Sequence, residues 1–343
     1  MLTESKFSEI REHLESSQNP LFLFDNDVDG LVSFLLLRRF VGRGKGVPIK
    51  SFPELDDSYT RKIEEFGSDK IFILDKPLVS KEFLEYAQQH NLPVIWIDHH
   101  PLQTHEGVYY YNPLNGKKPS SVPTSYICWR AVKKDDWLAM IGCIADWYMP
   151  EFAKDFSEKY PSILSKVGKP EDALFDSPLG KIVLMLGHGL RDSTTNVMKM
   201  IKALTEIEGP NDILSPNKHL EQMVERYEKL DKIYKKMLKK ALSSGSDEQI
   251  FFFRYSGDMA LSRNLCNELF YLKKGKKIVV IVKINGERAQ ISMTGPNDKD
   301  LRIIVAEALK IISGTGGGHK QAVGASINVG DLDRFKEIVE SYA

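Results

Sequence analysis

Three short, continuously apolar segments in the first third of the chain each end in an aspartate. They read LFLFD, IFILD and VIWID, and they end at Asp25, Asp75 and Asp98. A fourth run, VYYYN, ends in asparagine. Stretches with helical patterning separate these runs, at 31–41, 57–66 and 80–90. Continuous apolar strands that alternate with helices are typical of a parallel sheet covered by helices on both faces.

The three aspartates indicate a functional site, because ligands of open α/β sheets bind at the carboxyl ends of the strands. Carboxylates at three such ends would lie at one edge of the sheet. The alternative is that each aspartate only caps the helix that follows it. We favour the shared site, since separate caps would not explain why the same residue recurs at three strand ends.

The segment after the first strand, DNDVDG, carries alternating carboxylates. In an extended backbone alternate residues face the same side, so Asp25, Asp27 and Asp29 would point together. These negative charges repel one another, and a bound cation would offset them. An EF-hand loop begins in the same way, but its twelfth position requires a glutamate and here holds Leu36. The EF-hand is therefore excluded.

Two further groups extend this candidate metal site. Asp98 is followed by His99 and His100, and neighbouring residues of a regular strand point to opposite faces. One histidine is therefore expected to bind a metal while the other turns toward the substrate. Asp146 lies in an apolar helix predicted over 136–148, where a buried carboxylate needs a metal or a basic partner. Oxygen ligands with one imidazole suit Mn²⁺ or Mg²⁺ better than zinc.

The rest of the chain divides into further segments. Helical patterns fill 150–215, a long polar helix is expected over 216–242, and SSGSDE at 243–248 is typical of a linker. Beyond it, strands alternate with helices expected at 259–271, 298–312 and 330–341. The sequence therefore predicts an α/β protein with a larger domain at 1–215, a helical linker at 216–248 and a smaller α/β domain at 249–343.

A glycine-rich segment, GTGGGH at 314–319, is the candidate for anion binding in the smaller domain. Glycines let the backbone approach a phosphate and offer it N–H groups. No Gly-Lys-Ser/Thr follows, so the segment is not a Walker A loop, and the strand expected after it excludes a dinucleotide fingerprint. His319 and Lys320 favour a phosphate contact, and a simple turn is the alternative.

Composition limits the class of protein. Lys and Arg together equal Asp and Glu at 47 each, which excludes a protein that coats nucleic acid through bulk positive charge. Three scattered cysteines are too few for a disulfide framework, and the lack of a C-x-x-C pair argues against a structural zinc site. The N-terminus resembles neither a signal peptide nor a membrane helix, so we expect a cytoplasmic protein with no membrane partner.

The ordered segments DNDVDG, ILDKP, IDHHP and GCIAD closely resemble the four motifs of the DHH phosphoesterase superfamily. GTGGGH resembles the signature of the DHHA1 domain that often follows. The D-x-D-x-D-G form of the first motif is similar to the RecJ-like single-strand exonucleases, in a short form of archaeal type. The resemblance implies a parallel-sheet DHH domain and a smaller DHHA1 domain, joined by the long helix.

The resemblance also implies a role for each motif residue. The implied metal ligands are Asp25, Asp27, Asp29, Asp75, His99 and Asp146. Asp75 would bridge two divalent cations, with Mn²⁺ preferred and Mg²⁺ as the alternative, while His100 would approach the scissile phosphate and Asp98 would orient the histidines. The implied substrate contacts are Gly316, Gly317, Gly318, His319, Lys320 and Arg288. The DHHA1 strand usually carries Ser-x-Arg, which here reads Ser292-Met293-Thr294.

The implied function is two-metal phosphodiester hydrolysis, as an exonuclease that degrades single-stranded or short nucleic acids to mononucleotides. Replication or repair proteins would be further partners. One alternative is a phosphatase or phosphodiesterase for small substrates, such as oligoribonucleotides, pAp, a cyclic dinucleotide or polyphosphate. Another is an inactive, Cdc45-like replication scaffold, which a loss of acidic motif residues would favour, although all of them are present. RNA or DNA preference, strand polarity and oligomeric state stay open.

Overall fold

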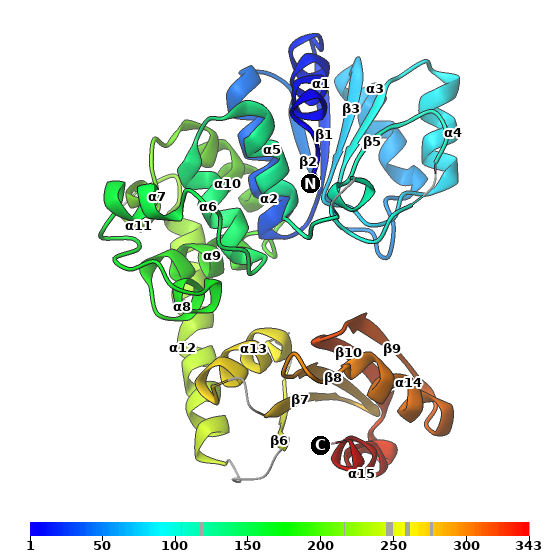
Figure 1. Cartoon of the computed structure of the whole chain (residues 1–343), viewed down its shortest axis with the longest axis vertical. Helices are drawn as coiled ribbons and strands as arrows, with labels where there is room; N and C mark the ends of the chain where they lie inside the picture. Colours follow the sequence, from blue (N-terminus) through cyan, green and yellow to red (C-terminus); the bar gives the residue numbers. More distant parts are fainter. Residues whose placement is uncertain are drawn as a thin grey trace. The chain divides into compact units, whose positions relative to one another are not determined.

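The computed structural model describes residues 1–103, 105–116, 119–215, 217–244, 250–257, 261–274 and 277–342. The chain forms two compact units, Met1–Tyr227 and Glu228–Ala343. Each unit contains its own five-stranded sheet (Figure 1). Among the described residues, no helix has the length and apolar character needed to cross a membrane.

The first sheet is parallel throughout, as the apolar runs predicted, with the strand order β2-β1-β3-β4-β5. Its strands are β1 (Pro20–Asp25), β2 (Lys45–Ile49), β3 (Lys70–Leu74), β4 (Val94–Ile97) and β5 (Tyr109–Tyr111). The sequence did not predict β2, because KGVPI has no continuous apolar run. Pro48 is accommodated there since β2 is an edge strand and pairs on one side only.

Helices cover both faces of this sheet, which explains the continuous apolar runs in β1, β3 and β4. In β1, Phe22 and Phe24 enter one hydrophobic core, while Leu21 and Leu23 enter the core on the opposite face. The first core is packed by α1 (Glu4–Glu15), α2 (Val28–Val41), α5 (Thr124–Val132) and α6 (Asp136–Ala145). The second is packed by α3 (Thr60–Phe66) and α4 (Lys81–Gln89) (Figure 1).

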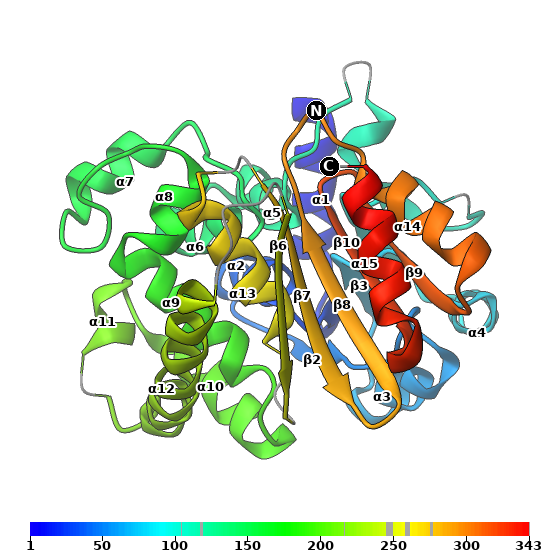
Figure 2. The ribbon, with the colours of Figure 1, turned by 90° about the horizontal axis from the view of Figure 1, so that it is seen from below.

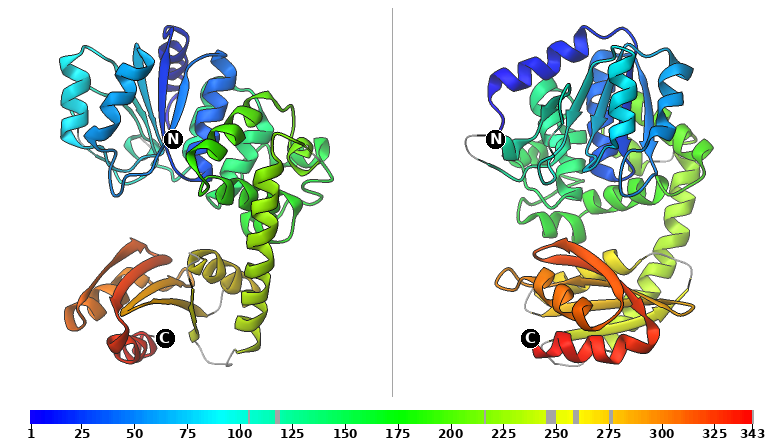
Figure 3. Two further views of the ribbon diagram at one scale, coloured as in Figure 1. Left: turned by 180° about the vertical axis from the view of Figure 1, so that it is seen from behind. Right: turned by 90° about the vertical axis from the view of Figure 1, so that its right-hand side faces the viewer.

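Further helices extend the first core beyond the sheet. They are α7 (Ala153–Lys159), α8 (Pro170–Phe175), α9 (Pro178–Gly189), α10 (Thr194–Glu206) and α11 (Asn211–Leu214). The long helix α12 (Glu221–Ser243) follows and is drawn in yellow-green in Figure 3. Met223 and Tyr227 at its beginning join the core of the first unit, and Tyr234 and Ala241 join a core of the second. Pro216 and residues 245–248 of the expected linker lie outside the described residues.

The second unit has a mixed sheet with the order β6-β7-β8-β10-β9. The strands are β6 (Ile250–Ser256), β7 (Ile278–Asn285), β8 (Arg288–Thr294), β9 (Gly314–His319) and β10 (Ala322–Asn328). Helices α14 (Leu301–Ile311) and α15 (Leu332–Ser341) pack on one face of this sheet (Figure 2). Helix α13 (Ser262–Leu272) packs with α12 on the other face, over β6 and β7. The expected residues 259 and 260 of this helix lie outside the described ranges.

The glycine-rich segment is a strand and not a loop. Residues 314–319 form β9, which pairs antiparallel with β10 at the edge of the sheet, so that Gly317 lies opposite Gly324. The alternative of a simple turn was therefore wrong. A run of glycines gives no apolar alternation, and only the partner strand supplies the pairing that fixes it in an extended form.

Candidate metal centre

The first acidic motif bridges β1 and α2. Asp25 is the last residue of β1, and Asp27 is the N-cap of α2, where its carboxylate accepts a hydrogen bond from the Gly30 N–H at 2.9 Å. Asp29 lies in the first turn of α2 and is 1% exposed. The expected extended run from Asp25 to Asp29 was therefore wrong, because α2 begins at Val28 and Asp27 is its cap. A Cβ on Gly30 would come within 2.5 Å of the Asp25 carbonyl oxygen, so only glycine allows this close turn.

The N-terminus of α5 fixes the Asp29 carboxylate. The Thr124 N–H donates to Asp29 Oδ2 at 2.8 Å, and the Ser125 N–H donates to Oδ1 at 3.0 Å. The Thr124 hydroxyl also donates to Asp75 Oδ1 at 3.0 Å. Thr124 was missed from the sequence, although Pro-Thr-Ser before an apolar run signals a helix start, where N–H groups stabilise anions. Thr124 therefore positions two candidate ligands at once.

Asp75 lies at the centre of the site. It follows β3 with a φ of 62°, in the left-handed region that aspartate tolerates better than most residues, and it is 1% exposed. Burial raises the pKa of Asp75 well above its usual value, and the neighbouring carboxylates of Asp29 and Asp27 raise it further. A buried carboxylate in this setting needs a cation or a shared proton.

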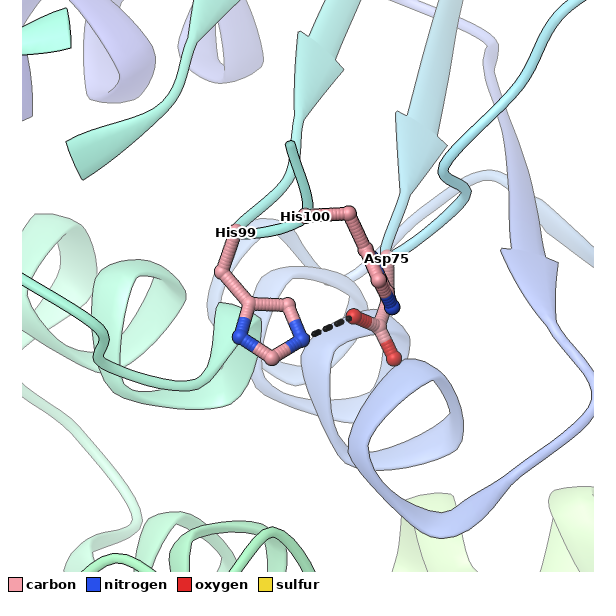
Figure 4. A group of neighbouring side chains, drawn as sticks. All are labelled: Asp75, His99 and His100. Carbon is pink, nitrogen blue, oxygen red and sulfur yellow. Dashed lines mark ion pairs between the residues drawn. The ribbon is translucent and has the colours of Figure 1, made fainter. Parts of the chain in front are cut away.

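His99 connects Asp75 to Asp146. Its Nε2 atom lies 3.3 Å from Asp75 Oδ1, the contact drawn in Figure 4, and 3.3 Å from Asp146 Oδ2. The expected burial of Asp146 inside a helix was wrong, because α6 ends at Ala145 and Asp146 is its C-cap. Trp147 follows with a φ of 58°, which turns the chain away and leaves the Asp146 side chain 32% exposed. This end of α6 therefore presents the carboxylate to His99.

His100 is held by Asp98. The Nδ1–H of His100 donates to Asp98 Oδ1 at 2.7 Å, and its backbone N–H donates to Oδ2 at 3.1 Å. Burial lowers the pKa of His100, but the hydrogen bond and charge of Asp98 outweigh it and leave the pKa raised. Asp98 itself is fully buried. The arrangement favours the protonated form of the ring and fixes its orientation.

The two histidine rings do not point to opposite sides. Their centroids are 4.5 Å apart in an edge-on contact, and the expectation from strand alternation was wrong because β4 ends at Ile97, before the motif. Nevertheless, only His99 contacts two carboxylates, while His100 is bonded to Asp98. That His99 binds metal while His100 faces the substrate therefore stays a prediction. It now rests on these contacts and not on strand alternation.

The donor set fits a divalent cation. Two groups of candidate ligand atoms each lie within 4.8 Å of one another, Asp29 with His99 and Asp146, and Asp75 with His99 and His100. Carboxylate oxygens with imidazole nitrogen match Mn²⁺ and Mg²⁺. The pKa of Asp27 is raised to about 6, first through partial desolvation by the groups packed around its carboxylate and then because Asp146 and Asp25 repel its charge. A bound cation would relieve this repulsion.

Asp25 stands apart from these two groups because it has a basic partner. Lys76 Nζ lies 3.1 Å from Asp25 Oδ1 and donates to the Ser51 carbonyl oxygen, also at 3.1 Å. Lys76 is 3% exposed, so its charge is fixed in place. It directly follows Asp75 in the sequence, yet only the fold shows that it reaches Asp25. Thus the structure gathers Asp29, Asp75, His99 and Asp146, with Asp27 and Asp25 at their side.

We expect Asp27→Asn to raise the melting temperature of the metal-free protein by a few degrees at about pH 8. The pKa of Asp27 lies near 6 in the folded chain and at 3.8 ordinarily, so the folded state loses stability as the pH rises through this interval. Asparagine keeps the cap, since it accepts the same Gly30 hydrogen bond. Thermal unfolding in EDTA measures the effect, and Mn²⁺ should then stabilise the wild type more than the variant. A variant that melts lower in EDTA would contradict the crowding of charge at this site.

The expected substrate contacts lie in the second unit and are not all together. Gly316 packs toward α14, where a Cβ would come within 2.8 Å of Val305, whereas a Cβ on Gly317 would meet nothing within 4 Å. Arg288 begins β8 and pairs with Asn328 of β10, whereas Gly317 pairs with Gly324 of the same strand. The two positions on β10 are four residues apart, which corresponds to about 13 Å along a strand. Its guanidinium donates to Ser326. Lys320 lies in the turn after β9, and the His319 side chain is outside the described atoms.

The comparisons with known proteins agree with this geometry. Residues 21–148 match the family model of the DHH family, N-terminal domain, and residues 248–343 match that of the DHHA1 domain. The chain therefore belongs to the DHH proteins and carries a DHH domain followed by a DHHA1 domain, as its motifs predicted. Members of this superfamily are metal-dependent phosphoesterases. No curated protein matches the chain in sequence.

Solved structures with the same fold include two RecJ proteins. RecJ from Thermus thermophilus in complex with Mn²⁺ has a TM-score of 0.68 and 15% identity, over 99% of this chain and 54% of that one. The present chain thus spans about half the length of that protein. Exonuclease RecJ bound to manganese gives a TM-score of 0.63 and 16% identity, over 100% of this chain and 94% of that one.

A smaller phosphodiesterase has a related fold. The pGpG-specific phosphodiesterase PggH from Vibrio cholerae has a TM-score of 0.52 and 15% identity, over 94% of this chain and 98% of that one. At these sequence identities the similarity shows a shared fold and no more. The choice of substrate for this chain must therefore be argued from its own residues.

Proposed function

We propose that the chain is a metal-dependent phosphodiesterase that acts as a RecJ-like exonuclease on single-stranded or short nucleic acids. The observation that supports it most is the cluster of carboxylates and histidines at the carboxyl ends of β1, β3 and β4 and at the end of α6. Four separate segments supply this cluster. A scaffold protein would have no reason to keep its buried charges together at such an energetic cost.

Two divalent cations, Mn²⁺ or Mg²⁺, are the proposed cofactors. The residues that would hold them are Asp25, Asp27, Asp29, Asp75, His99 and Asp146, with the buried Asp75 best placed to serve both. Bound there, the ions would activate water and neutralise charge on the phosphate. Thr124 would keep Asp75 and Asp29 in position through its hydrogen bonds to both carboxylates, and its neighbour Ser125 holds the second oxygen of Asp29.

His100 is the proposed proton donor to the leaving oxygen. The pKa of His100 is raised above its ordinary value, which favours the protonated ring, and Asp98 occupies Nδ1, so Nε2 is the nitrogen left for the substrate. A charged imidazole also attracts the phosphate. Asp98, which is buried and bonded to His100 through both oxygens, would be a positioning residue.

The second unit would bind the nucleotide next to the scissile phosphate. Among the described atoms, none lies within 4 Å of a Cβ placed on Gly317, so a sugar-phosphate backbone can approach this part of β9 closely. Gly316 and Gly318 serve the fold instead, because a Cβ there would meet Val305 or the Ala322 carbonyl oxygen. Of the predicted glycines, Gly317 is thus the best candidate for a substrate contact.

A phosphodiesterase for short linear dinucleotides is the second candidate. The likeness to PggH covers nearly all of both chains, whereas the likeness to Thermus RecJ covers about half of that protein. Both candidates share the metal site and the reaction. They differ in the length of the substrate, which degradation of oligonucleotides of graded length distinguishes.

Gly317→Val tests the proposal against a phosphatase for small esters. We expect the wild type with Mn²⁺ to hydrolyse both an oligonucleotide and bis-p-nitrophenyl phosphate. The variant should lose about tenfold to a hundredfold in kcat/KM on the oligonucleotide, because the valine side chain blocks the backbone approach, and keep its rate on the ester. The free space around Gly317 means that the fold tolerates the change.

Thr315→Val is the matched control, since Thr315 lies on the same face of the same strand, two residues away. It should leave both rates near the wild-type values. Equal loss on both substrates in Gly317→Val would mean that the strand acts on the fold or on the chemistry. An unchanged oligonucleotide rate would argue for a substrate that does not reach β9.

A further inference from the structure

A pocket of about 440 Å³ opens beside the metal centre, at the carboxyl end of β2. The strand register places Ile49 opposite Asp25, so the residues that follow β2 lie at the same edge of the sheet as the candidate ligands. Asp25 itself lines the pocket, together with Lys50, Phe52 and Lys76. All of these residues belong to the first unit.

Phe52 is the unusual feature of this pocket. Its side chain is 93% exposed, the highest value for a large apolar residue in the described part of the chain. The loop around it is nevertheless anchored. The Lys50 N–H donates to the Tyr59 hydroxyl at 2.7 Å, the Ser51 hydroxyl donates to the Glu54 carbonyl oxygen at 2.5 Å, and Lys76 binds the Ser51 carbonyl oxygen. An aromatic ring that an anchored backbone holds in water is available to stack on a base.

The charge around the ring favours an anion. Asp25 is paired with Lys76, and Asp192, which also lines the pocket, lies 3.7 Å from Arg226. Lys50 makes no ion pair with any described residue and is exposed at the pocket wall. Both carboxylates of the pocket thus have a basic partner, and the positive charge of Lys50 has no described counterion. A phosphate next to an aromatic ring is the chemistry of a nucleotide.

We propose that this pocket is a nucleotide subsite, in which Phe52 stacks on a base and Lys50 contacts the adjoining phosphate. The proposal rests on the proposed function, which it deepens by naming the part of the substrate that is recognised. Stacking on Phe52 requires a base, so the subsite selects nucleic acids over polyphosphate and small phosphate esters. It also places a base beside Asp25, within one nucleotide of the reacting phosphate.

A binding cycle with a base-deleted probe tests the stacking contact. The probes are a short single-stranded oligonucleotide and an abasic phosphodiester of the same length, measured by fluorescence anisotropy with Ca²⁺ in place of Mn²⁺, with their integrity checked by electrophoresis. We expect Phe52→Ala to weaken binding of the oligonucleotide by about fivefold to a hundredfold and to leave binding of the abasic probe unchanged. Phe52→Trp should restore the affinity.

Lys50→Ala tests the phosphate contact. It should weaken both probes and lower the slope of log affinity against log salt by about 0.7, the value for one contact to a single strand, whereas Phe52→Ala should not change the slope. Met198→Ala is the control, because this side chain of α10 is also exposed, at 42%, but does not line the pocket.

Two results would overturn the subsite: equal oligonucleotide affinity of Phe52→Ala and the wild type, or an equal loss on the abasic probe. If Phe52→Ala binds the oligonucleotide as tightly as the wild type, and the wild type hydrolyses the oligonucleotide normally, the subsite is refuted and the proposed function still holds. The reverse result, selective loss of base-dependent binding without any hydrolysis by the wild type, would support the subsite and remove the proposed function.

Discussion

Replacing Asp75 with asparagine is expected to lower the rate of phosphodiester hydrolysis by about a thousandfold or more at saturating Mn²⁺. Asp75 lies between His99 and Thr124, in electrostatic contact with Asp29 and Asp27, so it is the carboxylate best placed to serve both proposed ions. Asparagine has nearly the same shape but no charge. The rate on bis-p-nitrophenyl phosphate measures the effect without involving the second unit.

Two further measurements make this result interpretable. Circular dichroism should show that the variant is folded, because a neutral side chain relieves the repulsion that raises the pKa of Asp75. Calorimetric titration with Mn²⁺ should show weaker binding than in the wild type. Asp57→Asn, at an exposed carboxylate that is not among the candidate ligands, should leave rate and binding unchanged. Near-normal turnover of Asp75→Asn at saturating Mn²⁺ would contradict the two-metal account.

His100→Gln should retain most of the metal binding and still lose about a hundredfold to ten-thousandfold in kcat. Glutamine cannot supply a proton, although it can donate a hydrogen bond. The high-pH limb of the wild-type rate profile should disappear in the variant, because it would report loss of the His100 proton at a pKa above the ordinary value. The rate profile against pH, together with an Mn²⁺ titration, checks both statements.

Asp98→Asn provides the matched comparison for His100. It removes the charge that raises the pKa of His100 while leaving the imidazole in place, so the high-pH limb should move to lower pH and not disappear. Anomalous diffraction from crystals grown with Mn²⁺ would overturn the division of roles if it showed one ion bound by both His99 and His100.

The sequence was a good guide to this site where the chemistry lies at strand ends. Apolar runs that end in Asp25, Asp75 and Asp98 required buried strands, and parallel strands bring their carboxyl ends to one edge. Whether each carboxylate would ligate, cap or pair was not readable. Asp27 caps α2 because this helix begins earlier than its apolar pattern suggested. Asp25 contacts Lys76, a residue distant from it in the sequence.

Other features depended on contacts between segments that are distant in the sequence. Thr124 reaches Asp29 across 95 residues of sequence, and no local pattern contains that distance. The strand β2 has no continuous apolar run, and β9 consists largely of glycines, so their pairing with β1 and β10 is what defines them as strands. Neither segment carries the hydrophobic periodicity from which a strand is predicted.

The most direct test of the account is degradation of end-labelled single-stranded oligonucleotides, as RNA and as DNA, in Mn²⁺ and in EDTA. The account predicts that the wild type releases mononucleotides progressively from one end in Mn²⁺, that EDTA stops the reaction, and that Asp75→Asn is inactive under both conditions. Hydrolysis that persists in EDTA or in Asp75→Asn would contradict the metal centre. Intact oligonucleotides after incubation with Mn²⁺ would contradict the proposed exonuclease activity.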